Sequence, residues 1–281
     1  MENSPAGRSS CAAPIVAVVA CRVLEAEIAA LSSGATHIVR REFFEMGLHD
    51  QPAVLRDRLA GAIARAEAEP AVETVVLVYG LCGLALVDLG PRRCRLVVPR
   101  AHDCLTLFLG SKERYAEAMR REPGLYWYSP GWNRGQRVPG PEREAKLRAE
   151  YTARFGAEEA EALLEMERET LAHHTCAAYT DLRLPGGGEQ LAYARRCAAS
   201  LGWRFEHQPG DASLLRDLLH GPWDAGRFLV VAPGERIAHS SDAAIVKVVP
   251  AGPGFTARSL VGKPPWYVAS PTGGTPARDS R

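Results

Sequence analysis

The sequence lacks both an excess of one charge and a long apolar run. Its 281 residues contain 34 Lys and Arg against 33 Asp and Glu, which gives a formal net charge of +1. A nearly neutral chain has no field that attracts nucleic acid or an anionic membrane, so we expect neither as a partner. The longest uncharged stretch, Thr74 to Val87, is too short for a membrane helix of roughly 20 residues.

The chain also lacks a secretion signal and the common nucleotide-binding and CxxC motifs. Met1 to Ala13 is polar, and the apolar run Ile15 to Ala20 is too short for a signal peptide. We therefore expect a cytoplasmic protein whose seven cysteines are reduced thiols. Gly80-Leu81-Cys82-Gly83 is neither a P-loop nor a GxGxxG motif.

Apolar residues make up 46% of the chain, enough for a large core. Buried strands are predicted at 15–20, 37–40, 74–79 and 95–99, and amphipathic helices at 22–31 and 52–66. A further helix is predicted to begin near Asp103, its N-cap. This alternation predicts an α/β fold with a parallel sheet covered on both faces, in a Rossmann-like three-layer architecture.

Composition divides the chain into two similar α/β halves joined by helices. We expect a flexible tail at 1–13, an N-terminal half at 14–140 that carries the site, and a helical connection at 141–175. A smaller C-terminal half follows at 176–251, and a partly ordered tail at 252–281.

Cysteine-bearing segments follow three of the predicted strands. Cys21 ends the first strand, Gly80-Leu81-Cys82-Gly83 follows the third, and Arg100-Ala101-His102-Asp103-Cys104 follows the fourth. If the strands are neighbours, the three thiols converge within roughly 5 to 10 Å at one edge of the sheet. With His102 they form a zinc ligand set, and three thiolates alone also suit iron or an iron–sulfur cluster.

The same residues allow two other interpretations. Cys104, with His102 as base, Arg100 nearby and the amides of Gly80 and Gly83 as oxyanion donors, would be a nucleophile that needs no metal. Alternatively, Arg100, the glycine amides and a helix N-terminus bind phosphate or carboxylate without catalysis. Trp132 is a candidate wall of the crevice, where we expect a small polar or anionic substrate, and each cysteine alone also fits a small buried hydrophobe.

These strings, with others along the chain, resemble the bacterial and archaeal domain-of-unknown-function family 1638. The resemblance runs from about Val16 to Val249 and is carried by Ala20-Cys21-Arg22-Val23-Leu24, Tyr79-Gly80-Leu81-Cys82-Gly83, Pro99-Arg100-Ala101-His102-Asp103-Cys104, Leu109-Gly110-Ser111, Tyr115, Pro130-Gly131-Trp132, Tyr151, Gly210-Asp211, Gly221, Trp223 and Pro233-Gly234.

This resemblance places Cys21, Cys82, His102 and Cys104 in the signature of the family. Cys94, Cys176 and Cys197 lie outside it, which agrees with our prediction that Cys94 and Cys197 are core residues. The resemblance implies no specific activity. It suggests an association with corrinoid-dependent one-carbon metabolism, with a corrinoid-system protein as partner and a corrinoid contact.

Overall fold

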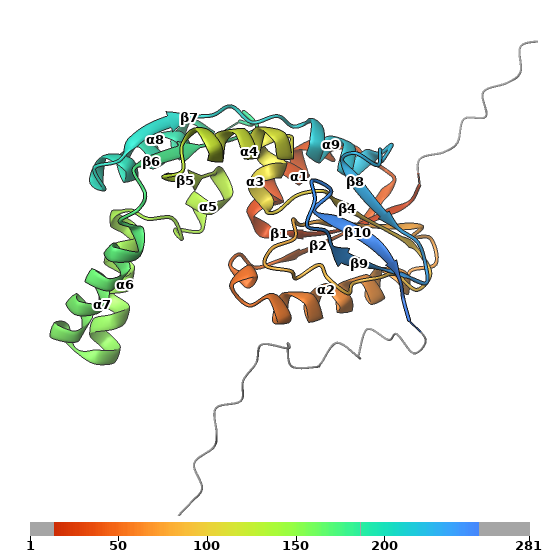
Figure 1. Ribbon diagram of the computed structural model, residues 1–281, viewed down its shortest axis with the longest axis horizontal. Helices are drawn as coiled ribbons and strands as arrows, with labels where there is room; N and C mark the ends of the chain where they lie inside the picture. The colour runs from red at the N-terminus through yellow and green to blue at the C-terminus, as the bar shows by residue number, and fades with distance from the viewer. Residues whose placement is uncertain (1–13, 186, 253–281) are drawn as a thin grey trace, which may run out of the picture.

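The computed structural model describes residues 14–185 and 187–252 and shows an α/β protein built on two sheets (Figure 1). The larger sheet has the strand order β2-β1-β3-β4-β8, and only β8 runs antiparallel to its neighbour. Its strands are β1 (Val16–Cys21), β2 (Ile38–Phe44), β3 (Thr74–Val78), β4 (Arg95–Pro99) and β8 (Phe228–Val231). The predicted α/β fold with mainly parallel sheets is confirmed.

Alternate residues of β3 enter two different cores, so the larger sheet is covered on both faces. Val75 and Leu77 pack with α2 (Pro52–Glu67) and with the hairpin of β9 (Glu235–His239) and β10 (Val246–Pro250). Val76 and Val78 pack with α1 (Glu25–Leu31), α3 (Cys104–Leu109) and α9 (Ser213–His220). No helix in the described ranges is both long enough and apolar enough to cross a membrane.

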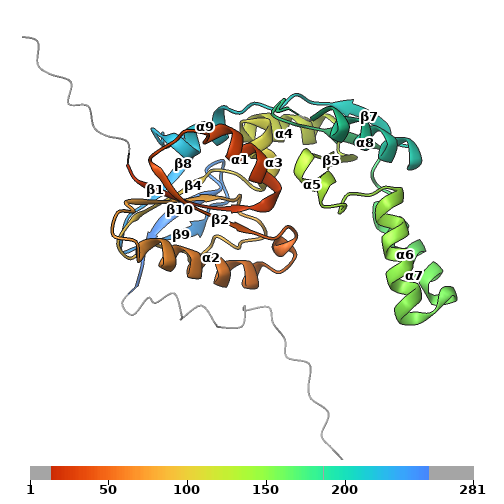
Figure 2. The same ribbon diagram turned by 180° about the vertical axis from the view of Figure 1, so that it is seen from behind.

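The smaller sheet is parallel and has the order β5-β6-β7, with strands Leu125–Tyr128, Cys176–Tyr179 and Arg204–His207. One face packs on α8 (Gly187–Ser200), and the other on α4 (Lys112–Arg121) and the end of α3. Between β5 and β6 the chain forms α5 (Pro130–Arg134), α6 (Pro141–Phe155) and α7 (Ala157–Leu171). The α6–α7 pair projects from the rest of the protein in both views (Figure 2).

The two sheets divide the chain differently from the boundaries expected at residues 140 and 176. Strand β5 leaves the larger sheet and pairs with β6, whereas β8 returns to pair with β4. The order of the strands along the chain does not show which sheet β5 or β8 joins. Helices α3 and α4 separate β5 from β4 in the sequence. The tails expected at 1–13 and 252–281 lie, except for Gly252, outside the described residues.

Backbone contacts at two glycines hold the smaller sheet against the larger one. A Cβ at Gly131, in α5, would overlap the carbonyl of Val23, in the 3-10 turn Arg22–Leu24, whose carbon lies 2.7 Å away. A Cβ at Gly210 would lie 2.5 Å from the carbonyl oxygens of Phe108 and Asp181. Neither approach leaves room for a side chain.

We predict that Gly131→Ala destabilises the protein by about 2 kcal/mol or more, because α5 must shift away from Val23. The measurement is the midpoint of urea unfolding. Gly188→Ala, in α8, is the control, because its added Cβ meets no atom within 4 Å and Ala favours a helix. Equal midpoints for the two variants would contradict the proposed close contact.

Candidate active site

The three cysteine-bearing segments meet at one edge of the larger sheet. Strands β1, β3 and β4 are parallel neighbours, as the prediction requires, so their carboxyl ends share an edge. Cys21 ends β1, Cys82 lies in the loop after β3, and Cys104 opens α3 after the loop that follows β4. Strand order therefore brings distant cysteines together.

The two loops continue the pairing of their strands. The Leu81 amide donates to the Ala101 carbonyl at 2.8 Å, and the Cys82 amide donates to the His102 carbonyl at 3.0 Å. Gly80 permits this approach, because a Cβ there would lie 2.5 Å from both the Cα and the nitrogen of Asp103. Cys82 then turns the chain with a left-handed φ of 46°.

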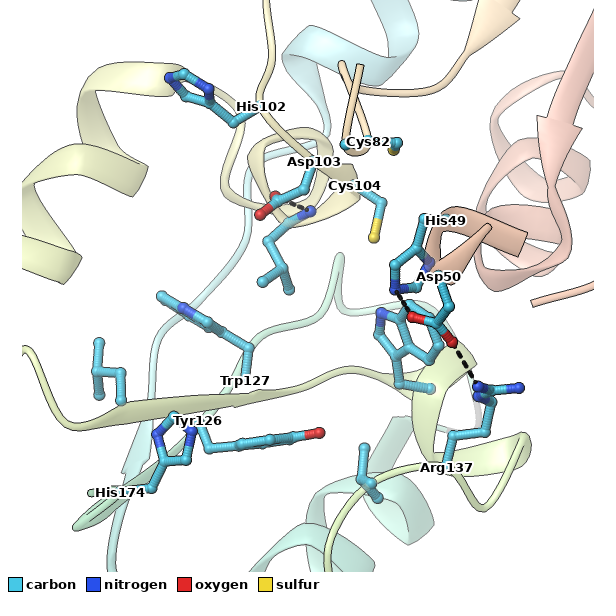
Figure 3. Close-up of a pocket in the computed structure, with 15 residues that line it drawn as sticks. His49, Asp50, Cys82, His102, Asp103, Cys104, Tyr126, Trp127, Arg137 and His174 are labelled. Atoms are coloured by element: carbon cyan, nitrogen blue, oxygen red, sulfur yellow. Dashed lines mark hydrogen bonds and ion pairs between the residues drawn. The ribbon is translucent and has the colours of Figure 1, made fainter. Parts of the chain in front are cut away.

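A cavity of about 590 Å³ opens where these loops face the smaller sheet (Figure 3). Thiols, imidazoles and aromatic rings form most of its wall. The residues that line it are His49, Asp50, Cys82, Gly83, His102, Asp103, Cys104, Leu105, Leu125, Tyr126, Trp127, Trp132, Arg137, Val138 and His174.

Most of the predicted site residues lie at this cavity. Cys82, Gly83, His102, Cys104 and Trp132 line it. Cys21 lies behind the wall and packs against the cores on both faces of the larger sheet. Gly80 lies at the contact between the loops instead of at the cavity surface.

Arg100 lies elsewhere, although the sequence analysis placed it in the site. Its guanidinium donates to the carbonyls of Ala225 at 2.8 Å, Ala244 at 2.9 Å and Val246 at 2.5 Å. These bonds fix the chain around β8 and β10. Arg100 is therefore committed to the fold and does not line the cavity.

The His102 side chain does not lie with the thiols, as the predicted zinc ligand set requires. Its exposed side chain points away from Cys82 and Cys104 (Figure 3). Within residues 14–185 and 187–252, no three His, Cys, Asp or Glu side chains are placed to hold a metal ion. His102 lies in the loop between β4 and α3. The alternation of side chains along a strand, which predicted that His102 and Cys104 point the same way, therefore does not apply to it.

Burial has the largest effect on the pKa values of the Cys82 and Cys104 thiols. It raises the pKa of Cys104 well above its usual range, and the nearby Asp103, Cys82 and Cys21 raise it further. Burial likewise raises the pKa of Cys82 to about 12. The Trp132 side chain lowers the Cys104 pKa only in part. Both thiols are therefore protonated at neutral pH.

Asp103 begins α3 as its predicted N-cap. Its carboxylate accepts a bond from the Leu105 amide at 2.9 Å, and the Tyr115 hydroxyl also donates to it. Burial raises the pKa of Asp103, and these bonds oppose that effect. The carboxylate is thus held in place beside the thiols.

A chain of polar contacts that the sequence analysis missed lies across the cavity from Asp103. The His49 ring packs edge-on against Trp132, with ring centroids 5.5 Å apart. His49 Nε2 lies 3.4 Å from Asp50 Oδ1, and Arg137 donates to Asp50 Oδ2 at 3.0 Å. His49, Asp50 and Arg137 line the same cavity as the Cys104 thiol (Figure 3).

The position of His49 follows the same topological rule as the cysteines. Strand β2 is the parallel neighbour of β1, and the turn Leu48–Asp50 lies a few residues beyond its carboxyl end. That rule, applied to the second predicted strand, would have selected His49 and Asp50. Arg137 follows no strand end in the larger sheet, so this rule could not have selected it.

A family model described as protein of unknown function (DUF1638) matches residues 43–219, which are 177 of the 281 residues. The chain belongs to this family. A search of curated proteins and a search of solved structures each found no match.

We predict that Gly80→Ala forces the loops of Cys82 and Cys104 apart and destabilises the protein by about 1 to 3 kcal/mol. Urea unfolding measures the loss, and faster alkylation of Cys82 reports the opened loop. Gly252→Ala, whose Cβ meets nothing within 4 Å, is the control. Wild-type stability and labelling in Gly80→Ala would show that the loops do not need this contact.

Proposed function

We propose that this member of a family of unknown function is a cysteine-dependent enzyme, in which Cys104 is the nucleophile and His49 the general base. One observation carries the proposal. Cys104, His49, Asp50 and Arg137 line a single cavity, where His49 lies 3.4 Å from Asp50 and Asp50 accepts a bond from Arg137 at 3.0 Å. These residue types are those of a nucleophile, a base and a group that orients the base.

The raised pKa of Cys104 explains why a base is needed. A buried thiol beside the Asp103 carboxylate is almost entirely protonated at neutral pH. Proton transfer from Cys104 Sγ to His49 would generate the nucleophile as it attacks, and Asp50 would stabilise the imidazolium that results. His49 takes the role that the sequence analysis gave to His102.

The charges of the cavity favour a neutral polar substrate. Arg137 is the one Arg or Lys among the described lining residues, and it is paired with Asp50. With Arg100 bound to carbonyls elsewhere, no unpaired Arg or Lys of residues 14–185 and 187–252 lines the cavity to attract an anion. Tyr126, Trp127 and Trp132 supply flat surfaces against which an uncharged molecule can pack.

We predict that His49→Gln slows alkylation of Cys104 by iodoacetamide at pH 7 at least about tenfold, because the base is lost. Asp50→Asn should have a smaller effect in the same direction. Peptide mass spectrometry after timed labelling measures the rate at each cysteine. Labelling of both variants should recover as the pH rises, because hydroxide then removes the proton that His49 no longer accepts.

His102→Gln is the matched control, since His102 lines the same cavity but points away from the thiol. It should label like the wild type. Slow labelling in His102→Gln with normal labelling in His49→Gln would restore His102 as the base.

A metal site is the second candidate, favoured by three thiols at the ends of adjacent strands. Cys21, Cys82 and Cys104 would hold zinc, or less readily iron or an iron–sulfur cluster, and would leave one position open to the cavity. The bound ion would act as a Lewis acid on a substrate in the cavity.

Three thiolates are suitable ligands for zinc, but their side chains are not placed around one point. Tyr79 is 4% exposed, and its hydroxyl has no hydrogen-bond partner among the described residues. Burial raises the pKa of this hydroxyl, and all three thiols raise it further, so it lies among them. An ion there would require the cysteine side chains to turn, because they do not converge as they stand.

If the metal candidate is right, elemental analysis of untagged protein should find about one equivalent of zinc, and Cys82→Ser with Cys104→Ser should lose it. Cys197→Ser is the control, because Cys197 is buried in the core against α8 and should leave the metal content unchanged. Folded wild type that stays metal-free after dialysis against zinc would rule this candidate out.

Two other predictions from the sequence concern a binding module and a corrinoid partner. A binding module without catalysis loses its main anion ligand, because Arg100 does not face the cavity. The corrinoid contact and the corrinoid-system partner remain predictions from the family resemblance alone.

A further inference from the structure

We infer that Cys82 and Cys104 form a redox pair, in which Cys82 resolves an oxidised Cys104 and the two sulfurs end as a disulfide. The inference rests on the proposed role of Cys104 as the reactive thiol. It adds a further activity, the two-electron reduction of a small hydroperoxide in the cavity.

The pairing of the strands sets the distance between the two cysteines. Val76 of β3 pairs with Val97 of β4, and the loop bond from the Cys82 amide to the His102 carbonyl extends the alignment. In this register Cys82 lies opposite Asp103, one residue before Cys104. Regular parallel strands continued in this register would place the two Cα atoms roughly 6 Å apart, inside the range that disulfides span.

Both side chains reach the same space. In regular strands, residues one position out of register point to opposite faces. Cys82, however, is left-handed and Cys104 opens α3, so neither follows strand alternation. Both thiols line the one cavity, where each can meet a small oxidant and then the other.

The chemistry balances with a hydroperoxide as the oxidant. The Cys104 sulfur attacks the peroxide oxygen, the O–O bond breaks, and the products are a Cys104 sulfenic acid and an alcohol. The Cys82 sulfur then attacks the Cys104 sulfur and expels water, which leaves the disulfide. A dithiol reductant returns both thiols and is itself oxidised to a disulfide.

The surroundings keep both sulfurs uncharged. Burial and the neighbouring groups penalise negative charge on either sulfur, so the reduced pair is two neutral thiols. The disulfide is also uncharged, so oxidation places no charge in this environment. Cys94, Cys176 and Cys197 are also buried, but they belong to separate cores and have no facing thiol at the cavity.

The test treats full-length, chelator-treated protein with tert-butyl hydroperoxide and maps its peptides without reduction. We expect a Cys82–Cys104 cross-link as the main product, with Cys94, Cys176 and Cys197 unmodified. Cys82→Ser should lose the cross-link and instead accumulate a sulfenic acid on Cys104, trapped by dimedone. Cys21→Ser should keep the cross-link.

Three results would overturn the inference: both thiols staying reduced, a cross-link from Cys104 to Cys21, or a wild-type Cys104 that stops at the sulfenic or sulfinic acid. The alkylation of Cys104 separates this failure from failure of the proposed function. If His49 still governs alkylation while no cross-link forms, only the redox pair falls. A Cys104 that neither alkylates nor oxidises would remove both.

Discussion

Backbone pairing beyond the ends of β3 and β4 is the constraint on which the site depends. Two amide–carbonyl bonds, from Leu81 and Cys82, tie one loop to the other after the regular strands have ended. Only a residue without a side chain fits at Gly80, because the Asp103 backbone occupies the space of a Cβ. Each buried amide that finds a carbonyl here avoids a cost of about 1 to 3 kcal/mol, so the two loops hold one geometry. The positions of both cavity thiols follow from that geometry.

The same burial that fixes the thiols also decides how they can react. A thiolate among Asp103 and other sulfurs is unfavourable, so the pKa of Cys104 is raised although Trp132 lowers it in part. Ionisation must therefore be coupled to a base, to a cation or to an oxidation that leaves no charge. The general base, the metal and the disulfide are three ways to avoid an uncompensated negative charge on the Cys104 sulfur. Of these, the base is the one whose proposed groups line the cavity together with Cys104 as the structure stands.

A parallel sheet could be predicted from the sequence because short apolar runs alternate with amphipathic helices, but the strand order could not, so the meeting of the cysteines was conditional on neighbouring strands. The structure makes those strands neighbours, and Cys82 and Cys104 line one cavity. The sequence could not orient His102 or Arg100, since side-chain direction beyond a strand end depends on loop geometry that periodicity does not encode. The exchange of β5 and β8 between the sheets was hidden for a similar reason. The sequence of a short strand does not indicate which strand it pairs with, as β5 and β8 show.

The two sheets contribute different parts of the site. The larger sheet supplies the thiols and His49, whereas the smaller sheet and its connections supply Trp132, Arg137 and the aromatic walls. The bond between Asp50 and Arg137 spans this division, but an exposed ion pair contributes about 1 kcal/mol or less. It can orient the imidazole without holding the sheets together. That task falls to the close contacts at Gly131 and Gly210, where no side chain intervenes. The His49 ring packs against Trp132, so its position depends on how the smaller sheet and its connections are placed.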